Sequence, residues 1–408
     1  MSDFFDSKEI RSTERRNEDN LRALSRQIGS AKKLVPFYRK AFRGIEPAQI
    51  NSLSDLGAID VLRKSDLMSI QSIDAPLGEL CPSNTKFDYF FQSPGPIYEA
   101  GTKAKDYWRM ARFLFALGIG KNDILQNCFS YHFTPAGAML ESGAFALGAS
   151  VFPAGTGNTE QQATAAASLG TTAYCGTPDY LLTILKKAKE MELDLSKLTK
   201  AAVSGGPLFP ELRTEYQELG IRCLQAYATA ELGLIAYETK PDEPMIVDED
   251  VIVEIVTPGT GNPVKPGEVG EVLVTLLRSD FPLFRFATGD LSMIVEGESS
   301  CGRTNTRIAG WKGRADQATK VRGMFVRPEQ VAKFQMKHAE ILKVRIVVDL
   351  RNSTDVMTVK LEIENDSRKN TDYYTESIIN SFKLKCELEI IDPGKLPNDG
   401  LVIEDLRP

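Results

Sequence analysis

The sequence predicts an α/β protein with a large N-terminal α/β domain, a β-rich subdomain and a small α+β C-terminal domain. Three patterns lead to this prediction: helix and strand signals alternate from Trp108 onward, strand signals without helices follow Glu243, and a separate mixed pattern begins past Gly313. Alternating helices and strands are typical of a parallel sheet with crossover helices. The chain has 408 residues, which is enough for one large core and a second, smaller one.

The composition argues against several classes of protein. The formal net charge is −6, and acids and bases are spread along the chain without a block of like charge. We therefore expect no nucleic-acid partner and no membrane partner. Six cysteines lie far apart with no CxxC pair, so we expect reduced and mostly buried thiols. The N-terminal 20 residues are charged and contain no apolar stretch, so we expect a cytoplasmic protein.

An amphipathic helix is predicted near the start of the chain. Apolar residues recur at intervals of three and four after Asn20, and the pattern ends before Pro36. These apolar positions are Leu21, Leu24, Ile28, Ala31 and Leu34.

The α/β core follows this opening region, with a helix running from Trp108 toward Gly118. Strand and helix then alternate, beginning with a strand, at residues 124–129, 144–149, 150–153, 159–169, 172–175 and 179–189. Two more short strands, at residues 201–204 and 222–227, each run into a loop of small residues, SGGP and ATAELG. Ligands usually bind at such loops, at the strand ends of a parallel sheet.

The rest of the chain is first β-rich and then mixed. Strands are predicted at residues 251–256, 271–277 and 291–295, separated by turns rich in glycine and proline. Past Gly313 we predict a helix at 327–338, strands at 344–349 and 356–364, a helix at 371–383 and a strand at 387–391. The predicted domains are therefore residues 1–315 and 316–408.

The segment LQAYATAELGLIAYE places three candidate residues at the end of a buried strand. Tyr227 ends the strand, Thr229 lies in the turn, and Glu231 is expected at the start of a short helix. Glu231 could bind Mg²⁺ through oxygen, while Tyr227 offers a flat face for a purine. A structural strand-turn-helix corner would use the same residue types, so the segment alone leaves both readings open.

Two further segments carry candidate residues. In PLFRFATGDLSMI, Asp290 is expected in a Thr-Gly-Asp turn, where it could accept hydrogen bonds from two vicinal hydroxyls; such turns are also common without a ligand. In GRADQATKVRGMFVRPEQV, a connector is followed by a basic turn, which in isolation is more often a solvated loop. Its candidates are Arg314, Asp316, Lys320, Arg322 and Gly323.

In this order and at these separations, the three segments resemble the phenylacetate-CoA ligase branch of the adenylate-forming superfamily. The resemblance runs almost end to end and includes VPFYRKAF, FPAGTGNTEQQ, CGTPDYLL, AVSGGPLFPELR and CGRTNTRIAGWKGRADQATKVRG. It implies the adenylate-forming enzyme fold, with a hinge between a large N-terminal domain and a mobile C-terminal domain. It also implies an AMP-forming acid–thiol ligase, which makes an acyl-AMP from ATP and a carboxylic acid and passes the acyl group to coenzyme A.

The resemblance also implies residue roles. Glu231 would hold Mg²⁺, Asp290 the ribose hydroxyls and Arg314 the ribose or phosphate, with Asp316 as the hinge. Thr229 and His132 would join Glu231 and Arg314 in catalysis, although His132 could equally be structural. The other residues implied for the nucleotide and coenzyme A are Ser93, Gly95, Ser204, Gly205, Gly206, Pro207, Tyr227, Ala228, Lys320, Arg322 and Gly323.

The acyl group would lie against two further segments of the chain. The resemblance places Tyr131, His132 and Phe133 on one side and Tyr174 with Gly176 on the other. An aromatic lining suits an aryl or arylacetic acid. A homodimer is a further expectation at the level of the family.

The sequence departs from the family pattern in its phosphate-binding loop. Ser93 and Gly95 remain, but the threonines and lysine of the family loop are replaced by Pro-Ile-Tyr and Glu99. Proline removes backbone N–H groups that such a loop uses for phosphate, and Glu99 adds an acid.

Two other family features are missing. The family lysine near the C-terminus is absent, since Leu401 follows Gly400. SSCGR keeps only Cys301 of a cysteine-rich metal site, so we expect no zinc. The losses of phosphate-binding groups motivate an alternative function, either ATP-independent acyl transfer or hydrolysis, or a non-catalytic homologue that binds acyl-CoA or nucleotide.

Overall fold

A computed structural model describes residues 3–315, 318–338, 340–351, 354–363, 371–397 and 401–407. The chain divides into two compact units. The first comprises Met1–Val253, Val274–Phe286 and Val295–Gly310, and the second comprises Glu254–Leu273, Ala287–Ile294 and Trp311–Pro408. Each unit is described by itself below, and the domain boundary after residue 315 stays a prediction.

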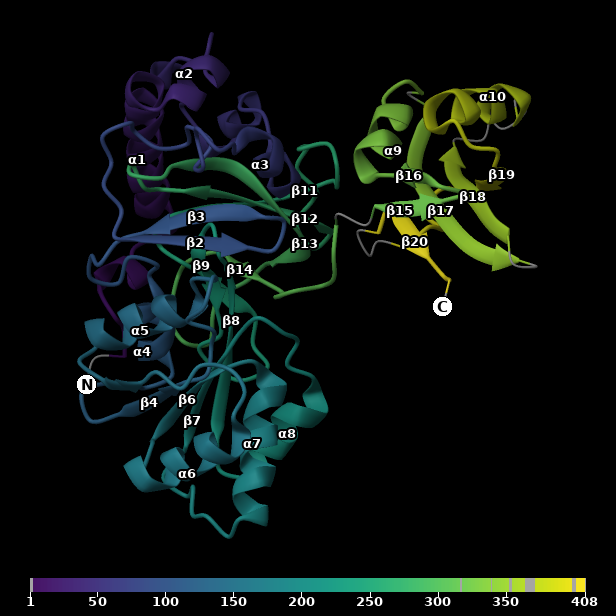
Figure 1. The fold of residues 1–408 in the computed structure, drawn as a ribbon. Helices are drawn as coiled ribbons and strands as arrows, with labels where there is room; N and C mark the ends of the chain where they lie inside the picture. The colour runs from purple at the N-terminus through teal and green to yellow at the C-terminus, as the bar shows by residue number, and fades with distance from the viewer. Residues whose placement is uncertain are drawn as a thin grey trace. The chain divides into compact units, whose positions relative to one another are not determined.

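The N-terminal region of the first unit is mainly helical (Figure 1). Its elements are η1 (Ser7–Ile10), α1 (Thr13–Leu34), α2 (Pro36–Ala41), η2 (Pro47–Gln49), η3 (Leu53–Ala58), β1 (Leu62–Arg63) and α3 (Lys64–Ile70). Helix α1 ends before Pro36, as predicted. It begins earlier than its apolar stripe, because the Ser12 hydroxyl accepts a hydrogen bond from the Arg15 backbone N–H at 3.2 Å and caps the first turn.

The α/β core contains five parallel strands, in the order β5-β4-β6-β7-β8. Its elements are α4 (Met110–Ala116), β4 (Ile124–Asn127), α5 (Ala136–Ala146), β5 (Ser150–Phe152), α6 (Thr159–Leu169), β6 (Ala173–Gly176), α7 (Pro178–Glu190), β7 (Lys200–Val203), α8 (Pro210–Glu218) and β8 (Arg222–Thr229). The predicted parallel sheet with crossover helices is confirmed.

The two faces of this sheet carry separate cores. Cys175, Ala202 and Leu224 pack with α4 and α5, whereas Tyr174 and Ala201 pack with α6, α7 and α8. Neighbouring residues of a strand point to opposite faces. Figure 1 shows the same division, with α4 and α5 on one side of the strands and α6, α7 and α8 on the other.

Antiparallel strands continue the sheet beyond β8. Strand β9 (Gly233–Tyr237) pairs with β8, followed by β10 (Met245–Val247) and β14 (Arg307–Ile308). The prediction of a helix starting at Glu231 is wrong, because Glu231 lies in the tight turn between β8 and β9. Gly233, with a φ of +72°, opens β9, and its position against the Trp108 backbone leaves no room for a side chain.

A short hairpin stands where the family phosphate loop was expected. Strand β2 (Tyr89–Ser93) pairs antiparallel with β3 (Ile97–Gly101), with Ser93 opposite Ile97. Only three residues therefore join the strands.

Strands β11 (Val251–Val256), β12 (Val269–Leu276) and β13 (Leu283–Val295) have residues in both units. The predicted turn at Thr288–Asp290 is wrong, because β13 runs through it. Backbone hydrogen bonds from Ala315 N–H to the Gly289 carbonyl (2.7 Å) and from Leu291 N–H to the Gly313 carbonyl (2.9 Å) keep this segment in the strand, although Gly289 has a φ of +75°.

The C-terminal part of the second unit is an α+β module with its own apolar core. Its elements are β15 (Thr319–Val321), β16 (Met324–Val326), α9 (Pro328–Gln335), β17 (Ile341–Arg351), β18 (Thr354–Ile363), α10 (Thr371–Phe382), β19 (Glu387–Ile391) and β20 (Ile403–Asp405). The sheet order is β19-β18-β17-β20. The predicted helices and strands are present, whereas β15, β16 and β20 were not predicted.

Candidate active site

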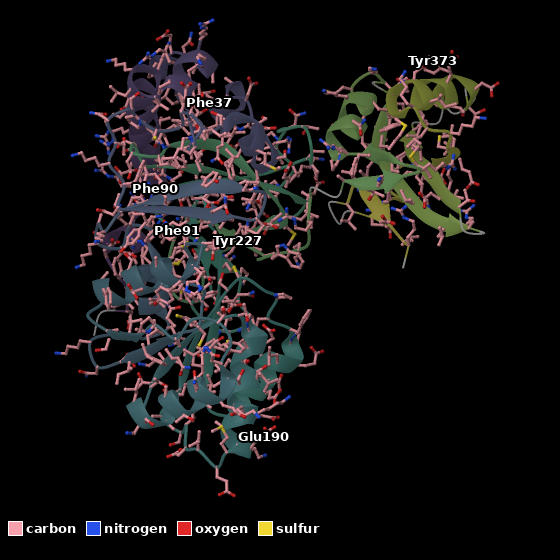
Figure 2. All side chains as sticks on the ribbon, in the orientation of Figure 1. Phe37, Phe90, Phe91, Glu190, Tyr227 and Tyr373 are labelled. Atoms are coloured by element: carbon pink, nitrogen blue, oxygen red, sulfur yellow. The ribbon has the colours of Figure 1, made fainter. Side chains whose placement is uncertain are left out.

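The loops after β7 and β8 lie at the carboxyl ends of the parallel strands. Ser204, directly after β7, donates its hydroxyl to the Ala226 carbonyl at 2.9 Å and its backbone N–H to the Gly176 carbonyl at 3.2 Å. Gly206 accepts a hydrogen bond from the Gln225 side chain at 2.9 Å. These bonds fix the Ser204–Pro207 segment beside Tyr227 and Ala228 of β8, which Figure 2 helps to locate through its Tyr227 label.

An apolar cavity of about 170 Å³ opens beside these loops. None of its lining residues is charged. One end is formed by loop residues and Ser93, and the body by side chains of α4, α5 and the sheet face that they cover. The lining residues are Ser93, Met110, Phe113, Phe129, Thr134, Pro135, Ala136, Met139, Leu140, Ala202, Ser204, Gly205, Ala226, Ala228, Thr229 and Ala230.

Two buried acids, Glu99 and Glu231, are candidates for the site although neither lines the cavity. Glu231 follows Ala230 and is 5 % exposed, and Glu99 of β3 is 2 % exposed. The Lys64 ammonium, at the start of α3, lies 2.8 Å from Oε1 of Glu231. No carboxylate oxygen of either glutamate has a hydrogen bond of normal length and angle within the described residues.

The charges of Glu231 and Lys64 both influence the pKa of Glu99. Burial and, second, repulsion by the Glu231 carboxylate raise the pKa of Glu99 from 4.5 to about 7, against the smaller lowering effects of Ser93 and Lys64. Two acids and one lysine leave this buried group with an excess of negative charge. Such an arrangement favours a bound cation or a proton.

The predicted acyl-contacting residues are not among those that line the cavity. Tyr131 donates its hydroxyl to Glu141 at 2.9 Å, His132 is exposed, and the ring of Phe133 is 73 % exposed. Tyr174 is fully buried on the opposite face of the sheet, and its hydroxyl lies where a side chain on Gly176 would have to be.

The second unit contains the other predicted nucleotide residues. Asp290 is 8 % exposed, and its Oδ1 accepts hydrogen bonds from Trp311 Nε1 (3.1 Å) and Arg314 (3.0 Å). The backbone N–H of Arg322 donates to Asp355 at 2.9 Å. Lys320 and Gly323 are exposed, the former on β15 and the latter in the turn between β15 and β16. The predicted hinge residue Asp316 lies outside the described residues.

Comparisons with known proteins bear on this arrangement. A family model described as AMP-binding enzyme matches residues 103–275. Phenylacetate-coenzyme A ligase of Thermus thermophilus is 28 % identical over 358 residues, covering 83 % of this chain and 80 % of the relative. The phenylacetate-coenzyme A ligase of Aromatoleum evansii is 29 % identical over 374 residues, and the match covers 86 % of this chain and 83 % of the relative.

Residues 103–275 thus match the AMP-binding enzyme family, and the similarity to phenylacetate-coenzyme A ligases extends over more than four-fifths of the chain. A solved structure of 2-hydroxyisobutyryl-CoA ligase, in an open conformation with 2-HIB-AMP and CoA, has a TM-score of 0.73. It is 22 % identical, and the match covers 97 % of this chain and 92 % of that one. At this identity the match establishes the shared fold, and the resemblance seen in the sequence is confirmed at the level of the family.

Part of this site has no recognisable signal in the sequence. Lys64 lies far from every motif, and only the ion pair with Glu231 reveals it. Glu99 stands out in the sequence only as an added acid, and its burial could not be predicted from it. Met110, Met139 and Leu140 also line the cavity, but in the sequence they cannot be distinguished from ordinary core residues.

Two searches of the described residues gave no match. No group of three or more histidine, cysteine, aspartate or glutamate side chains there could hold a metal ion. In that part of the chain, every helix is too short or too polar to span a membrane.

Proposed function

We propose that this chain is an AMP-forming ligase that joins a small aromatic carboxylic acid to coenzyme A. The observation that carries the proposal is the uncharged cavity of about 170 Å³ that opens at the loops after β7 and β8. An apolar cavity of about 150 Å³ is large enough to bind benzene. A phenyl ring can therefore fill this space, with its carboxylate toward Ser204, Gly205 and Thr229.

Adenylation requires the carboxylate oxygen to attack the α-phosphorus of ATP in line with the departing pyrophosphate. The chain contributes mainly by holding the acid and by fixing charge around the phosphates. Ser204, Gly205 and Thr229 line the cavity, and they would hold the carboxylate.

Glu231 is proposed to hold Mg²⁺. Its carboxylate is buried and already lies 2.8 Å from the Lys64 ammonium, which fits an oxygen ligand that can accept a cation. When bound, Mg²⁺ would offset negative charge on the phosphates. Tyr227 and the Ser204–Pro207 segment are proposed to contact the adenine.

Residues of the second unit are proposed to complete nucleotide and coenzyme A binding. Asp290, already an acceptor of two hydrogen bonds, would accept ribose hydroxyls with Arg314 nearby. Lys320, Arg322 and Gly323 stay candidates for coenzyme A or phosphate, and Asp316 for the hinge. His132, Tyr131 and Phe133 stay proposals that require this loop to move toward the acyl group.

The alternative of an ATP-independent acyl transferase or a non-catalytic binding protein is not favoured. Relatives over more than four-fifths of the chain are phenylacetate-coenzyme A ligases. We further propose that the enzyme acts in the cytoplasm, where ATP and coenzyme A would be supplied, and that it forms a homodimer.

The test is product analysis. The full chain is incubated with ATP, Mg²⁺, coenzyme A and a panel of aromatic and medium-chain acids, and the thioesters are identified by mass spectrometry. Phenylacetyl-CoA or another aryl thioester should form with release of AMP, and Glu231→Gln should abolish it. Absence of thioester with every acid, while nucleotide still binds in calorimetry, would refute the ligase assignment.

A further inference from the structure

A second cavity, of about 600 Å³, opens at the amino ends of the parallel strands, and all of its lining residues belong to the first unit. Lys200 and Arg222, which begin β7 and β8, line this cavity. At the other ends of the same strands, Ser204 and Thr229 line the apolar cavity of the candidate active site. Strand β7 has four residues and spans about 13 Å, so a small ligand in the second cavity would not occupy the active site.

Positive charge predominates in the second cavity, which is lined by three lysines and two arginines but only two aspartates. Lys200 and Arg222 are direct partners in the pairing of β7 with β8, so their side chains leave the sheet on the same face. Arg222 also donates to the Thr239 carbonyl at 2.9 Å, and Lys240 follows Thr239 in the chain. The fold thus brings like charges together, which is unfavourable unless acids or a bound anion offset them.

Two of the five cations are neutralised by acids of the chain itself. Lys200 donates to both carboxylate oxygens of Asp123, at 2.8 and 2.9 Å. The guanidinium of Arg303 lies 3.1 Å from the buried carboxylate of Glu9. These two cations are therefore held in place and carry little uncompensated charge.

The other three cations keep most of their charge available. Lys121 and Arg222 are exposed and form no ion pair within the part of the chain that the structure describes. Lys240 is exposed and lies 4.0 Å from Glu243, and an exposed ion pair at such a distance contributes little. Burial alone lowers the pKa of Arg222, which fits a guanidinium without a neutralising acid.

One wall of the cavity is apolar. Phe4, Phe115 and Ile119 contribute to it, and the Phe5 ring packs edge-on against Phe115 with 5.8 Å between the ring centroids. The cavity volume lies within the range of about 300–1,000 Å³ that is typical of small-molecule sites. Cations beside an apolar wall match a ligand that has both an anionic group and an apolar body.

We propose that this cavity binds a small molecule that carries a phosphate group and an apolar body. Lys121, Arg222 and Lys240 hold the phosphate, and Phe115 contacts the apolar body. Arginine presents a planar fork of donors to phosphate oxygens, and lysine adds a point charge. A phosphate monoester has a charge of about −1.5 to −2 at neutral pH, so it offsets more of this positive charge than a carboxylate does. The site does not depend on the function proposed above.

The site is tested with 1-naphthyl phosphate as the probe, by isothermal titration calorimetry on the full chain. Arg222→Gln should raise the Kd at least about tenfold, because a charged donor to the phosphate is lost. Arg222→Lys, which keeps the charge, should recover part of the affinity. Lys240→Gln changes only an exposed side chain and should raise the Kd severalfold. The control Lys186→Gln removes an exposed lysine of α7 that does not line the cavity and should leave the Kd unchanged.

The titration is repeated with saturating AMP and with inorganic phosphate, because an aryl phosphate could also enter the active site. AMP should not displace the probe, and inorganic phosphate should bind more weakly than the probe. An unchanged Kd in both Arg222→Gln and Lys240→Gln, or an equal rise in Lys186→Gln, would overturn the proposal. So would displacement of the probe by AMP, or a wild-type chain that binds no probe at millimolar concentration. Equal affinity for inorganic phosphate would overturn the contact with Phe115.

Discussion

Replacing Glu99 by glutamine should stabilise the metal-free protein at alkaline pH. Burial and repulsion by Glu231 raise the pKa of Glu99 from its ordinary value of 4.5 to about 7. Below pH 4.5 the side chain is protonated in both the folded and the unfolded protein. Between pH 4.5 and 7 the unfolded chain loses this proton first, so the stability of the fold falls as the pH rises, and the loss is complete above pH 7.

The size of the loss follows from the difference between these pKa values. A tenfold change in a protonation equilibrium is about 1.4 kcal/mol, so the full effect is about 3 kcal/mol. For a chain of 150–250 residues, 1 kcal/mol shifts the Tm by about 2–4 °C. In this longer chain, Glu99→Gln should therefore raise the Tm at pH 8 by a few degrees.

Thermal unfolding by differential scanning fluorimetry, with EDTA present, measures this difference at pH 5 and pH 8. Glu99→Gln should melt above wild type at pH 8 and close to it at pH 5. Glu141→Gln serves as the control with no such pH-dependent difference. A Glu99→Gln variant that is less stable than wild type at both pH values would refute the reasoning, since it would mean that the ionised carboxylate is well solvated or paired.

Three further predictions follow from the two units. Ala226→Phe fills the apolar cavity and should raise the KM for the aryl acid at least about tenfold in steady-state assays, with little effect on ATP binding; an unchanged KM would exclude this cavity as the acyl site. Asp290→Ala should weaken ATP binding by about one to two orders of magnitude in calorimetry, because a charged acceptor for the ribose is lost, and Asp290→Asn should recover part of it. Arg213→Met removes the partner of the buried Glu238, 2.7 Å away, and should lower the free energy of unfolding in urea by about 3–5 kcal/mol; near-wild-type stability would mean that Glu238 takes up a proton instead.

The α/β core could be predicted because its patterns are local. Segments such as Thr159–Leu169 have the length and composition of one element, and α6 has these bounds. Small residues after β7 and β8 marked the strand ends, and Ser204 and Thr229 in these loops both line the apolar cavity. In the α/β core, the local sequence pattern and the tertiary packing therefore favour the same helices and strands.

Errors arose where distant contacts decide the backbone. Thr288-Gly289-Asp290 has the composition of a turn, yet hydrogen bonds with Gly313 and Ala315 keep it in β13. Glu231 looked like a helix start, but pairing of β8 with β9 makes it part of a hairpin turn. Neither pairing leaves a trace within the local sequence.

The sequence also could not predict which charged side chains of the candidate site meet in the folded protein. A motif could identify Glu231, but its ion pair with Lys64 joins residues from α3 and the β8–β9 turn. Glu99 could be recognised as a departure from a phosphate loop, and taken alone that departure argued against ATP chemistry. Its burial, which raises its pKa to about 7, depends on the packing around β3 and could not be predicted from the sequence.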